Sequence, residues 1–447
     1  MKLKPLAIII ALTTGFSTTL SATTLQEAVD ATIKTNPDVL AASSERSAVA
    51  EEVKQARAGY YPTVDLALGI GWEESDNPTT RPNDTPANDH NHEDLERGEA
   101  SLQLRQMLFD GMATKNEVTR QKARTDARSY GVFSSAENTA LEATNAYLNV
   151  LRRQKLVDLA MTNYEAHERT HDQIKLRSER GVGRRADNDQ SLGRLSLARS
   201  NLIAEQSNLR DAETAYIRIV GMVPEGLQDP MSPSSVIPES LDEAISIALE
   251  NHPTLNSAKA DLESAHAQHE TASSPFYPRV DFELGTTADN NIDGVRGHNK
   301  DITAMFRLRY NLLNGGRDSA RKQETAYLIN QAAEIRNNTH RQVEESVRLS
   351  WNALKTVNSQ MDYFRQHVAS SESSRDAYQQ QFGLGQRTLL DLLDSENEVF
   401  SSRQSLVNAE YDQLFAMYRI VNSMGSLLQT IDVVPPETAT IMSAESE

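Results

Sequence analysis

Apolar residues alternate with small or charged residues in four short segments of the chain. These segments are residues 64–72, 100–109, 280–287 and 302–312. Because the side chains of a strand point alternately to two faces, the alternation predicts four β-strands, each with one apolar and one polar face. An ordinary half-buried sheet would show the same pattern. A length of about nine to eleven residues also suits strands that cross a bilayer in a barrel.

Two long segments are almost free of helix-breaking residues. Residues 112–180 contain no proline and one glycine, and residues 317–382 contain neither. Apolar or small side chains recur there at alternating spacings of three and four, as at Ala140, Ala143 and Tyr147, which predicts helices with one buried seam. At 1.5 Å per residue each helix would be about 100 Å long. Each is followed by a short break and a second helix that returns antiparallel.

The whole pattern is written twice. YYPTVDLALG from Tyr60 matches FYPRVDFELG from Phe276 at an offset of 216, and LRQMLFDG from Leu104 matches LRYNLLNG from Leu308 at an offset of 204. Each copy predicts a helix, a strand pair, a long helix and a return helix, so we expect two tandem structural repeats. The predicted units are a first repeat, a second repeat and a flexible C-terminal tail: residues 23–238, 239–432 and 433–447.

The N-terminus has the order of a secretory signal peptide. Lys2 and Lys4 precede an apolar run from Leu6 to Leu12, and small and hydroxyl residues follow through Ala22. We therefore expect residues 1–22 to be removed on export. No later stretch is apolar enough for a spanning helix, so a membrane protein with this sequence would span as strands. Four strands cannot close a barrel, since the smallest single-chain membrane barrels use about eight, and several copies would have to share one.

Charge and composition exclude several classes of protein. The chain has 45 Lys and Arg against 63 Asp and Glu, a net charge of −18, which would repel nucleic acid. It has no cysteine, so disulfides, thiolate metal sites and thiol nucleophiles are absent. The histidines are scattered, and neither a phosphate loop nor a nucleophile elbow occurs. We expect no enzyme, no cofactor and no nucleic-acid partner.

The segment between the first two strands is polar. Residues 73–98 are rich in Asp, Asn, Pro and Thr and have no apolar run, so we expect a surface loop that faces the exterior. The run Asp-His-Asn-His-Glu-Asp from Asp89 could coordinate a metal ion. A solvated polar loop is the preferred interpretation, and no metal site is predicted.

This combination resembles the TolC family of outer-membrane efflux proteins over essentially the whole mature chain. The stretch GLGQRTLLDLLDSENE from Gly383 is the most specific part. Together with AGYYPTVDLALG and LRQMLFDG it looks most like the agglutination-protein branch, which serves type I secretion of large adhesins. The resemblance implies an α+β membrane protein of the Gram-negative outer membrane. Three protomers would supply four strands each to one barrel, and their long antiparallel helices would continue as a tunnel across the periplasm.

The same resemblance implies partners and leaves alternatives. An inner-membrane ABC transporter and a periplasmic adaptor would dock at the lower end of the tunnel, and a protein cargo, a large adhesin, would pass through it. A multidrug or small-molecule efflux duct of the same fold is the nearest alternative. A periplasmic coiled-coil scaffold is another, although a scaffold does not need strands with an apolar face.

Candidate site residues lie at both ends of the predicted structure. The charged residues of the strands would face a wet lumen: Asp65, Arg105, Asp281, Glu283, Arg307 and Arg309. The matched breaks at Gly183 and Gly385 would form the periplasmic tip, because glycine tolerates the backbone conformation that such a turn requires.

The resemblance also implies a gate at that tip. Asp391 and Asp394 would project inward from three protomers as acidic rings, while Arg387, Arg185 and Asp189 would form the bonds that hold the entrance closed. At a spacing of three the two aspartates share one helix face. The alternative is that these residues are solvated charges at helix ends, where Asp near an N-terminus is favoured by the helix dipole.

Overall fold

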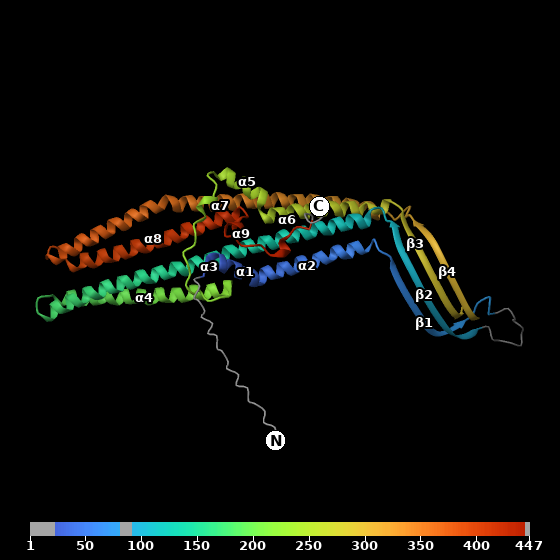
Figure 1. Cartoon of the computed structure of the whole chain (residues 1–447), viewed down its shortest axis with the longest axis horizontal. Helices are drawn as coiled ribbons and strands as arrows, with labels where there is room; N and C mark the ends of the chain where they lie inside the picture. Colours follow the sequence, from blue (N-terminus) through green and yellow to red (C-terminus); the bar gives the residue numbers. More distant parts are fainter. Residues whose placement is uncertain (1–22, 81–91, 443–447) are drawn as a thin grey trace, which may run out of the picture.

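A computed structural model of the chain describes residues 23–80 and 92–442. The predicted signal peptide therefore lies outside the described residues, as do residues 81–91 of the polar segment. The molecule is elongated, with helical hairpins at one end and four strands at the other (Figure 1). The core lies between these ends, where the helices of both halves meet.

The order of elements in the first half recurs in the second. The first half contains α1 (Leu25–Thr35), α2 (Pro37–Ala58), β1 (Thr63–Ser75), β2 (Glu93–Phe109), α3 (Ala113–Glu179) and α4 (Arg185–Val220). The second contains α5 (Leu241–Asn251), α6 (Pro253–Ala272), β3 (Arg279–Ile292), β4 (Val295–Arg309), α7 (Arg317–Gly383) and α8 (Leu389–Ser423). Shorter elements are η1 (Pro233–Val236), η2 (Ser274–Phe276), α9 (Leu427–Thr430) and η3 (Glu437–Ala439). The predicted repeat boundary at residues 238–239 lies between η1 and α5 and stays a prediction.

Each half opens on two helices where the sequence pattern predicted one. Pro37 begins α2 and Pro253 begins α6, because proline lacks an N–H and fits the first turn of a helix but not its interior. Asn36 and His252, the residues before them, cap the new helices. Each accepts a hydrogen bond from the N–H two residues further on, at 2.8 and 3.3 Å. The break turns the chain between two short packed helices.

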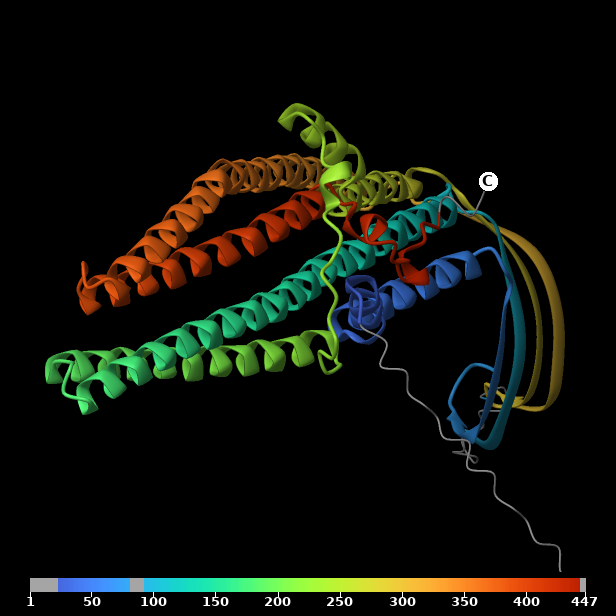
Figure 2. The same cartoon turned by 60° about the vertical axis from the view of Figure 1, so that its left-hand side comes forward.

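The long helices are confirmed. Both α3 and α7 have 67 residues, about 100 Å at 1.5 Å per residue. They pair with α4 and α8 to give two hairpins (Figure 2). A narrow seam of α3 is fully buried, namely Ala136, Ala140, Ala143, Tyr147 and Val150, again at spacings of four and three. Within the described ranges, no helix has both the length and the apolar character needed to cross a membrane.

The four strands form one antiparallel sheet in the order β1-β2-β3-β4. They are longer than predicted, since β1 runs on to Ser75 and β2 begins at Glu93. The predicted loop 73–98 is therefore strand at both of its ends. Residues there still pair, Glu73 with Leu95 for example, because a backbone ladder does not require apolar side chains.

The second strand pair also differs from its predicted bounds. β3 and β4 are joined directly through Asp293 and Gly294, with φ of 56° and 74°. Positive φ at both residues is what a two-residue hairpin turn with Asp-Gly requires. At its other end β4 stops at Arg309, whereas the alternation had extended the strand to Leu312.

The C-terminal segment is docked on the helices as far as Met442. The Thr438 hydroxyl donates to the Ser43 hydroxyl at 2.8 Å, and the Met442 N–H donates to the Asp126 carboxylate at 2.7 Å. The structure thus gives residues 433–442 contacts with the helices, and the flexible tail from residue 433 onward stays a prediction. The polar groups that suggested flexibility are the ones that form these bonds. Residues 443–447 lie outside the described residues.

A buried carboxylate joins this segment to α3. Glu137 is 2% exposed. Its carboxylate accepts the N–H groups of Leu427 and Leu428, the first residues of α9, at 3.1 and 3.0 Å. The Asn422 side chain donates to the main-chain oxygen of Glu137 at 2.9 Å. Burial raises the pKa of Glu137 to about 7, although these hydrogen bonds oppose the shift.

We expect this junction to weaken as the pH rises. The ordinary pKa of the carboxyl is 4.5 and the folded value is about 7, so the stability it contributes is fully present below about pH 4.5 and is lost as the pH passes about 7. The loss is roughly 3 kcal/mol. Glu137→Gln should remove this pH dependence. Hydrogen exchange of the Leu427 and Leu428 amides, compared between variant and parent at each pH, measures it.

The control is Glu142→Gln, because Glu142 lies on the same helix and is exposed. It should keep the pH dependence of the parent protein. If Glu137→Gln also kept it, the carboxyl of Glu137 would not be the titrating group.

Candidate functional site

The two helical hairpins turn back at one end of the molecule, through residues 180–184 and 384–388. Gly181 and Gly385 have φ of 76° and 75°, the left-handed region that favours glycine. The sequence match had placed Gly183 opposite Gly385. Gly183 lies in the same turn, where an added Cβ would come within 3.0 Å of Ser178 N. The match of Gly183 with Gly385 implied an offset of 385 − 183 = 202 between the halves. In the structure α3 and α7 are equally long and Gly181 corresponds to Gly385, so the offset is 385 − 181 = 204.

Arg387 and Asp391 lie together at the start of α8. The Asp391 carboxylate accepts the hydroxyl and the N–H of Thr388 at 2.8 and 3.2 Å. The Asp391 N–H donates in turn to the Thr388 hydroxyl oxygen at 3.3 Å, which completes a capping box. These bonds, with the nearby Arg387 charge, hold the pKa of Asp391 below its ordinary value. Arg387 lies 4.0 Å from that carboxylate, donates to Gln381 at 2.9 Å and sits 4.3 Å from the centre of the Tyr378 ring. Both side chains therefore have partners within one chain.

Asp394 is bonded to the other hairpin. Arg194 of α4 approaches Asp394 of α8 to 2.6 Å, so an ion pair ties the two hairpins together near the tip, in addition to the pair of Arg152 and Asp412 further along. By contrast, Arg185 and Asp189 are exposed on α4, and neither side chain has an ion pair or hydrogen bond within the described part of the chain. Sequence reasoning missed Arg194, because its partner is 200 residues away and no local pattern marks it.

A small apolar cluster packs the hairpins against each other near the tip. Ile174 of α3, Leu389 and Leu393 of α8 and Phe382 of α7 form it. The two leucines are one helical turn apart, a spacing that the run Thr-Leu-Leu-Asp-Leu-Leu displays openly. Any separation of the hairpins must expose this cluster as well as break the ion pair of Arg194.

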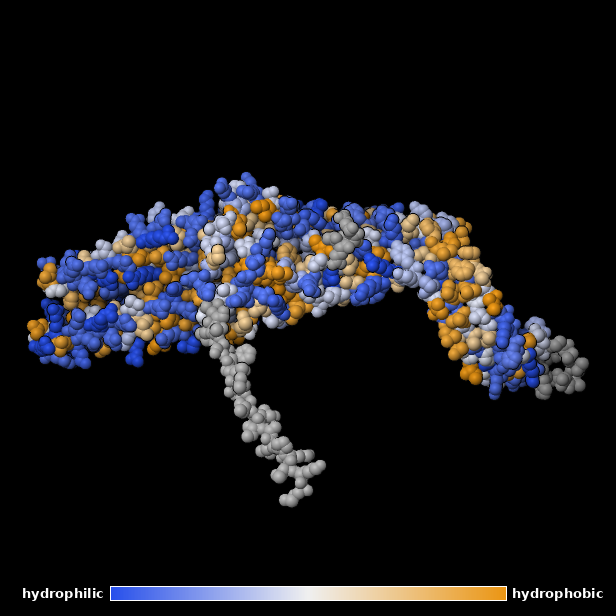
Figure 3. Space-filling model, viewed as in Figure 1, coloured by the Kyte–Doolittle hydropathy of each residue, from blue (hydrophilic) through white to orange (hydrophobic). Residues whose placement is uncertain are grey.

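The register of the sheet separates apolar from charged side chains. Val64, Leu104, Leu284 and Ala304 form one row across the four strands. All six charged strand residues predicted to face a lumen lie on the opposite face, since each is an odd number of positions from this row. The apolar face is open: Ile70 is 94% exposed, and apolar side chains cover the middle of the strands (Figure 3).

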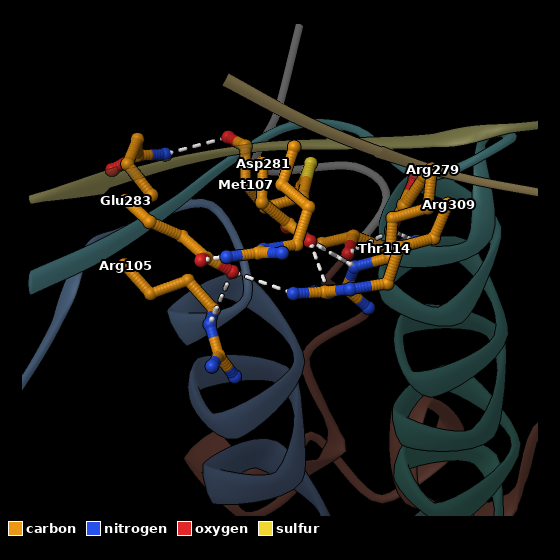
Figure 4. A network of polar contacts seen from close by, with 10 residues as sticks. Arg105, Met107, Thr114, Arg279, Asp281, Glu283 and Arg309 are labelled. Carbon is orange, nitrogen blue, oxygen red and sulfur yellow. Dashed lines mark hydrogen bonds and ion pairs between the residues drawn. The ribbon is translucent and has the colours of Figure 1, made fainter. Parts of the chain in front are cut away.

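Glu283 is the centre of a charged cluster on the polar face, at the end of the sheet next to the helices (Figure 4). It is 6% exposed. Arg105, Arg307 and Arg309 approach its carboxylate to 3.5, 2.7 and 2.5 Å. A buried carboxylate is tolerated only when it is paired, and here β2 and β4, the strands on either side of β3, supply the partners.

Asp281 extends the cluster and is fully buried. Arg309 approaches it to 2.8 Å and Arg279 to 3.1 Å. Arg279 was missed by sequence reasoning, although its charge stands directly after Pro278 at the start of a predicted strand. Asp65, also predicted to lie here, has no side-chain hydrogen bond or ion pair among the described residues.

Three possible metal ligands meet at the far end of the first two strands. Glu74, His92 and Asp94 each bring one ligand atom within 4.8 Å of the others, and all three are exposed. His92 and Asp94 belong to the polar run considered above, of which residues 89–91 lie outside the described residues. Exposed acidic groups of this kind are common without a metal ion, so the cluster assigns no function.

Comparison with known proteins supplies the family. The profile described as "Outer membrane efflux protein" matches residues 28–222 and 244–426. The chain belongs to this family. The two matched stretches fall in the two halves of the fold, and the resemblance inferred from GLGQRTLLDLLDSENE is confirmed.

Several relatives extend over most of the chain. "Outer membrane efflux protein BepC" of Brucella suis biovar 1 is 25% identical over 84% of this chain and 80% of its own length. "Outer membrane protein TolC" of Escherichia coli K12 is 24% identical over 95% and 87%. "Alkaline protease secretion protein AprF" of Pseudomonas aeruginosa is 23% identical over 87% and 81%. A crystal structure of CusC matches with a TM-score of 0.75 at 15% identity, over 91% of each chain, and so shares the fold.

Membership in the outer membrane efflux protein family fixes the location and the general class. The protein belongs to the outer membrane of Gram-negative bacteria, its helical tunnel extends into the periplasm, and it is an exit channel. The family and fold are those of transport channels and not of enzymes. The predicted fold class, long helical hairpins joined to a four-strand antiparallel sheet in a channel fold, is likewise confirmed.

Gly385→Ala should destabilise the turn after α7 by about 1 kcal/mol, because other residues disfavour the left-handed region. No atom lies within 4 Å of the Cβ that alanine would add, so the cost is conformational. Gly385→Asn should cost less, since Asn visits this region. Hydrogen exchange of the Gln386 amide, which donates to Gln381 O at 2.8 Å, reports the opening of the turn.

Gly193→Ala is the matched control. Gly193 lies inside α4 with equally open surroundings, and alanine there should stabilise the helix by up to about 1 kcal/mol. A destabilisation of similar size at both positions would contradict a special backbone conformation at Gly385.

Proposed function

We propose that three copies of this chain form the exit duct of a type I secretion system. An inner-membrane ABC transporter and a periplasmic adaptor would deliver a protein, and a large adhesin is the cargo class we favour. The main support for the proposed trimer is the sheet, which has four strands, one open apolar face and two outer edges. Channels of this family are trimeric exit ducts that work with adaptors and inner-membrane transporters. In this arrangement the charged strand residues line the lumen.

Two observations support a protein cargo. One relative, AprF, is named as a protease secretion protein. The stretch from Gly383 to Glu398 resembles the agglutination-protein branch of the family. Small-molecule efflux is the alternative, because BepC is named as an efflux protein and the same fold serves both. A periplasmic scaffold fits less well, since family membership places the chain in the outer membrane.

We further propose that the helical tip is the gate. Asp391 and Asp394 would form acidic rings around the three-fold axis. Arg185 and Asp189 are exposed and have no partner within the described part of their own chain, so they are available to a neighbouring copy. Exposed ion pairs contribute about 0 to 1 kcal/mol each. A few of them would hold the entrance closed and still yield to a docking adaptor.

Deleting the gene should remove one large protein from the cell surface or the medium, because the duct is its only route out. Quantitative proteomics of the surface and medium fractions identifies that protein. Restoring the gene should restore it. Unchanged secretion together with a lower tolerance of small toxic compounds would favour the efflux alternative.

Arg387→Ala combined with Asp189→Ala should raise the single-channel conductance in planar bilayers, because bonds that close the entrance are lost. Neutralising Asp391 and Asp394 to Asn should weaken block by multivalent cations, since the acidic rings that bind them are gone. Both variants are measured as trimers of confirmed size.

Asp362→Asn is the control for the loss of charge. Asp362 lies on α7 well before the tip, and its side chain is 91% exposed. It should leave cation block unchanged. Unaltered conductance and block in the tip variants would mean that flow is controlled elsewhere.

A further inference from the structure

We infer that Asp65 of one copy pairs with Arg307 and Arg309 of the next copy, so that the charged cluster of Figure 4 is completed across the boundary between two protomers. This inference rests on the proposed trimer, but it goes further by naming the residues that meet. It assigns Asp65 to a neighbour's cluster and identifies β1 and β4 as the surfaces that recognise a second copy of this chain.

The two outer strands have the right direction to pair. Every neighbouring pair within the sheet is antiparallel, so β4 runs antiparallel to β1. Each outer strand presents one row of backbone groups without a partner in the described sheet. Nearly all residues of β1 and all residues of β4 are exposed. A ring of copies that joins β4 to the next β1 removes both free edges.

Height along the strands brings the charged residues together. A three-fold axis places equivalent residues of all copies at one level. At the end next to the helices, β1 begins at Thr63 and β4 ends at Arg309. Asp65 is two residues from the first of these ends, and Arg307 is two residues from the second. Within one chain the ladder carries the row of Asp65 to Thr303 of β4. Strands of a closed barrel tilt and are staggered, and a stagger of four to six residues places Asp65 of the next copy beside Arg307 or Arg309.

The face of the sheet restricts the pairing further. Asp65, Arg307 and Arg309 all lie on the polar face, as their cross-strand partners within the sheet establish. Slipping an antiparallel pair by one residue would send these side chains to the opposite face. Asp65 must then stand opposite Arg307 or Arg309 and never opposite Leu308. Arginine is long enough to reach a diagonal neighbour as well, so either register lets Asp65 contact both.

The charges complement each other. Within one chain, Asp281 and Glu283 face four arginines, which are Arg105, Arg279, Arg307 and Arg309. The four arginines share two carboxylates, so the cluster has an excess of two positive charges. Two of the four arginines stand on the β4 edge, and the β1 edge carries Asp65, which has no partner among the described residues of its own chain. Because like charges that stand close together repel one another, a neighbour's carboxylate beside the surplus lowers the energy of the cluster.

Cysteine cross-linking tests the pairing cleanly, because the chain has no cysteine of its own. The full-length protein carries Asp65→Cys with Arg309→Cys, or Asp65→Cys with Arg307→Cys, and is oxidised in outer membranes. Directly opposite residues are close enough for a disulfide. At least one pair should convert most chains into covalent dimers and trimers on non-reducing gels. Each single variant, and Leu66→Cys with Arg309→Cys, whose cysteines lie on opposite faces, should remain uncross-linked.

The outcomes separate this inference from the proposed function. A trimer by light scattering in detergent without cross-links in either pair would overturn the inference and leave the duct intact. A protein that is monomeric in detergent would overturn both.

If the cysteine variants fail to accumulate, Asp65→Asn tests the same contact. It should lower the temperature at which the trimer dissociates, whereas Asp289→Asn on the inner strand β3 should leave it unchanged. An unchanged dissociation temperature for Asp65→Asn would equally overturn the inference.

Discussion

Backbone groups at the two outer edges of the four-strand sheet are the constraint on which the rest of this structure depends. An N–H or C=O away from water needs a partner, and the outer strands leave a row of them unpaired. The helices of the chain cannot provide partners, because they lie beyond one end of the sheet and do not cover it (Figure 1). Nor do they cover its apolar face. In the proposed trimer, closure by identical copies within a membrane would satisfy both demands, and the helical hairpins would continue from the sheet around a common axis.

Buried apolar side chains are distributed unevenly along the length of the molecule. The main core gathers residues from both halves, and two tyrosines fix the linker that joins them: Tyr147 donates to Gln228 O at 2.7 Å and Tyr418 to Met231 O at 2.6 Å. At the tip the apolar cluster is small, and the tie between hairpins is the exposed pair of Arg194 and Asp394. Local opening is easiest where few apolar contacts are buried. The fold therefore concentrates its ability to move at the end where a gate is proposed.

Sequence patterns predicted those parts of the fold that follow from a regular spacing of apolar residues or from the lack of helix-breaking residues. Alternation gave the strands and their two faces, and the lack of proline gave the long helices. The alternation did not predict the extension of β1 to Ser75, because the residues there are polar on both faces and pair only through their backbone. Gly181 and Gly183 stand two positions apart, and a local match could not tell which one takes the left-handed turn. Arg194 could not be predicted at all, since only the fold brings it to Asp394.

In the proposed duct, the charge along the conducting path would differ from the charge of the whole chain. A net charge of −18 describes the total surface, whereas the polar face near the helices gathers four arginines against Asp281 and Glu283. With Asp65 of a neighbour added, the balance there is 4 − 3 = +1 per protomer. The tip instead presents Asp391 and Asp394. A passing molecule responds to the nearest charges, because fields are screened over about 10 Å. Its path in the proposed duct would run from an entrance where Arg387 and Arg194 stand beside these carboxylates, at 4.0 and 2.6 Å, to a basic collar.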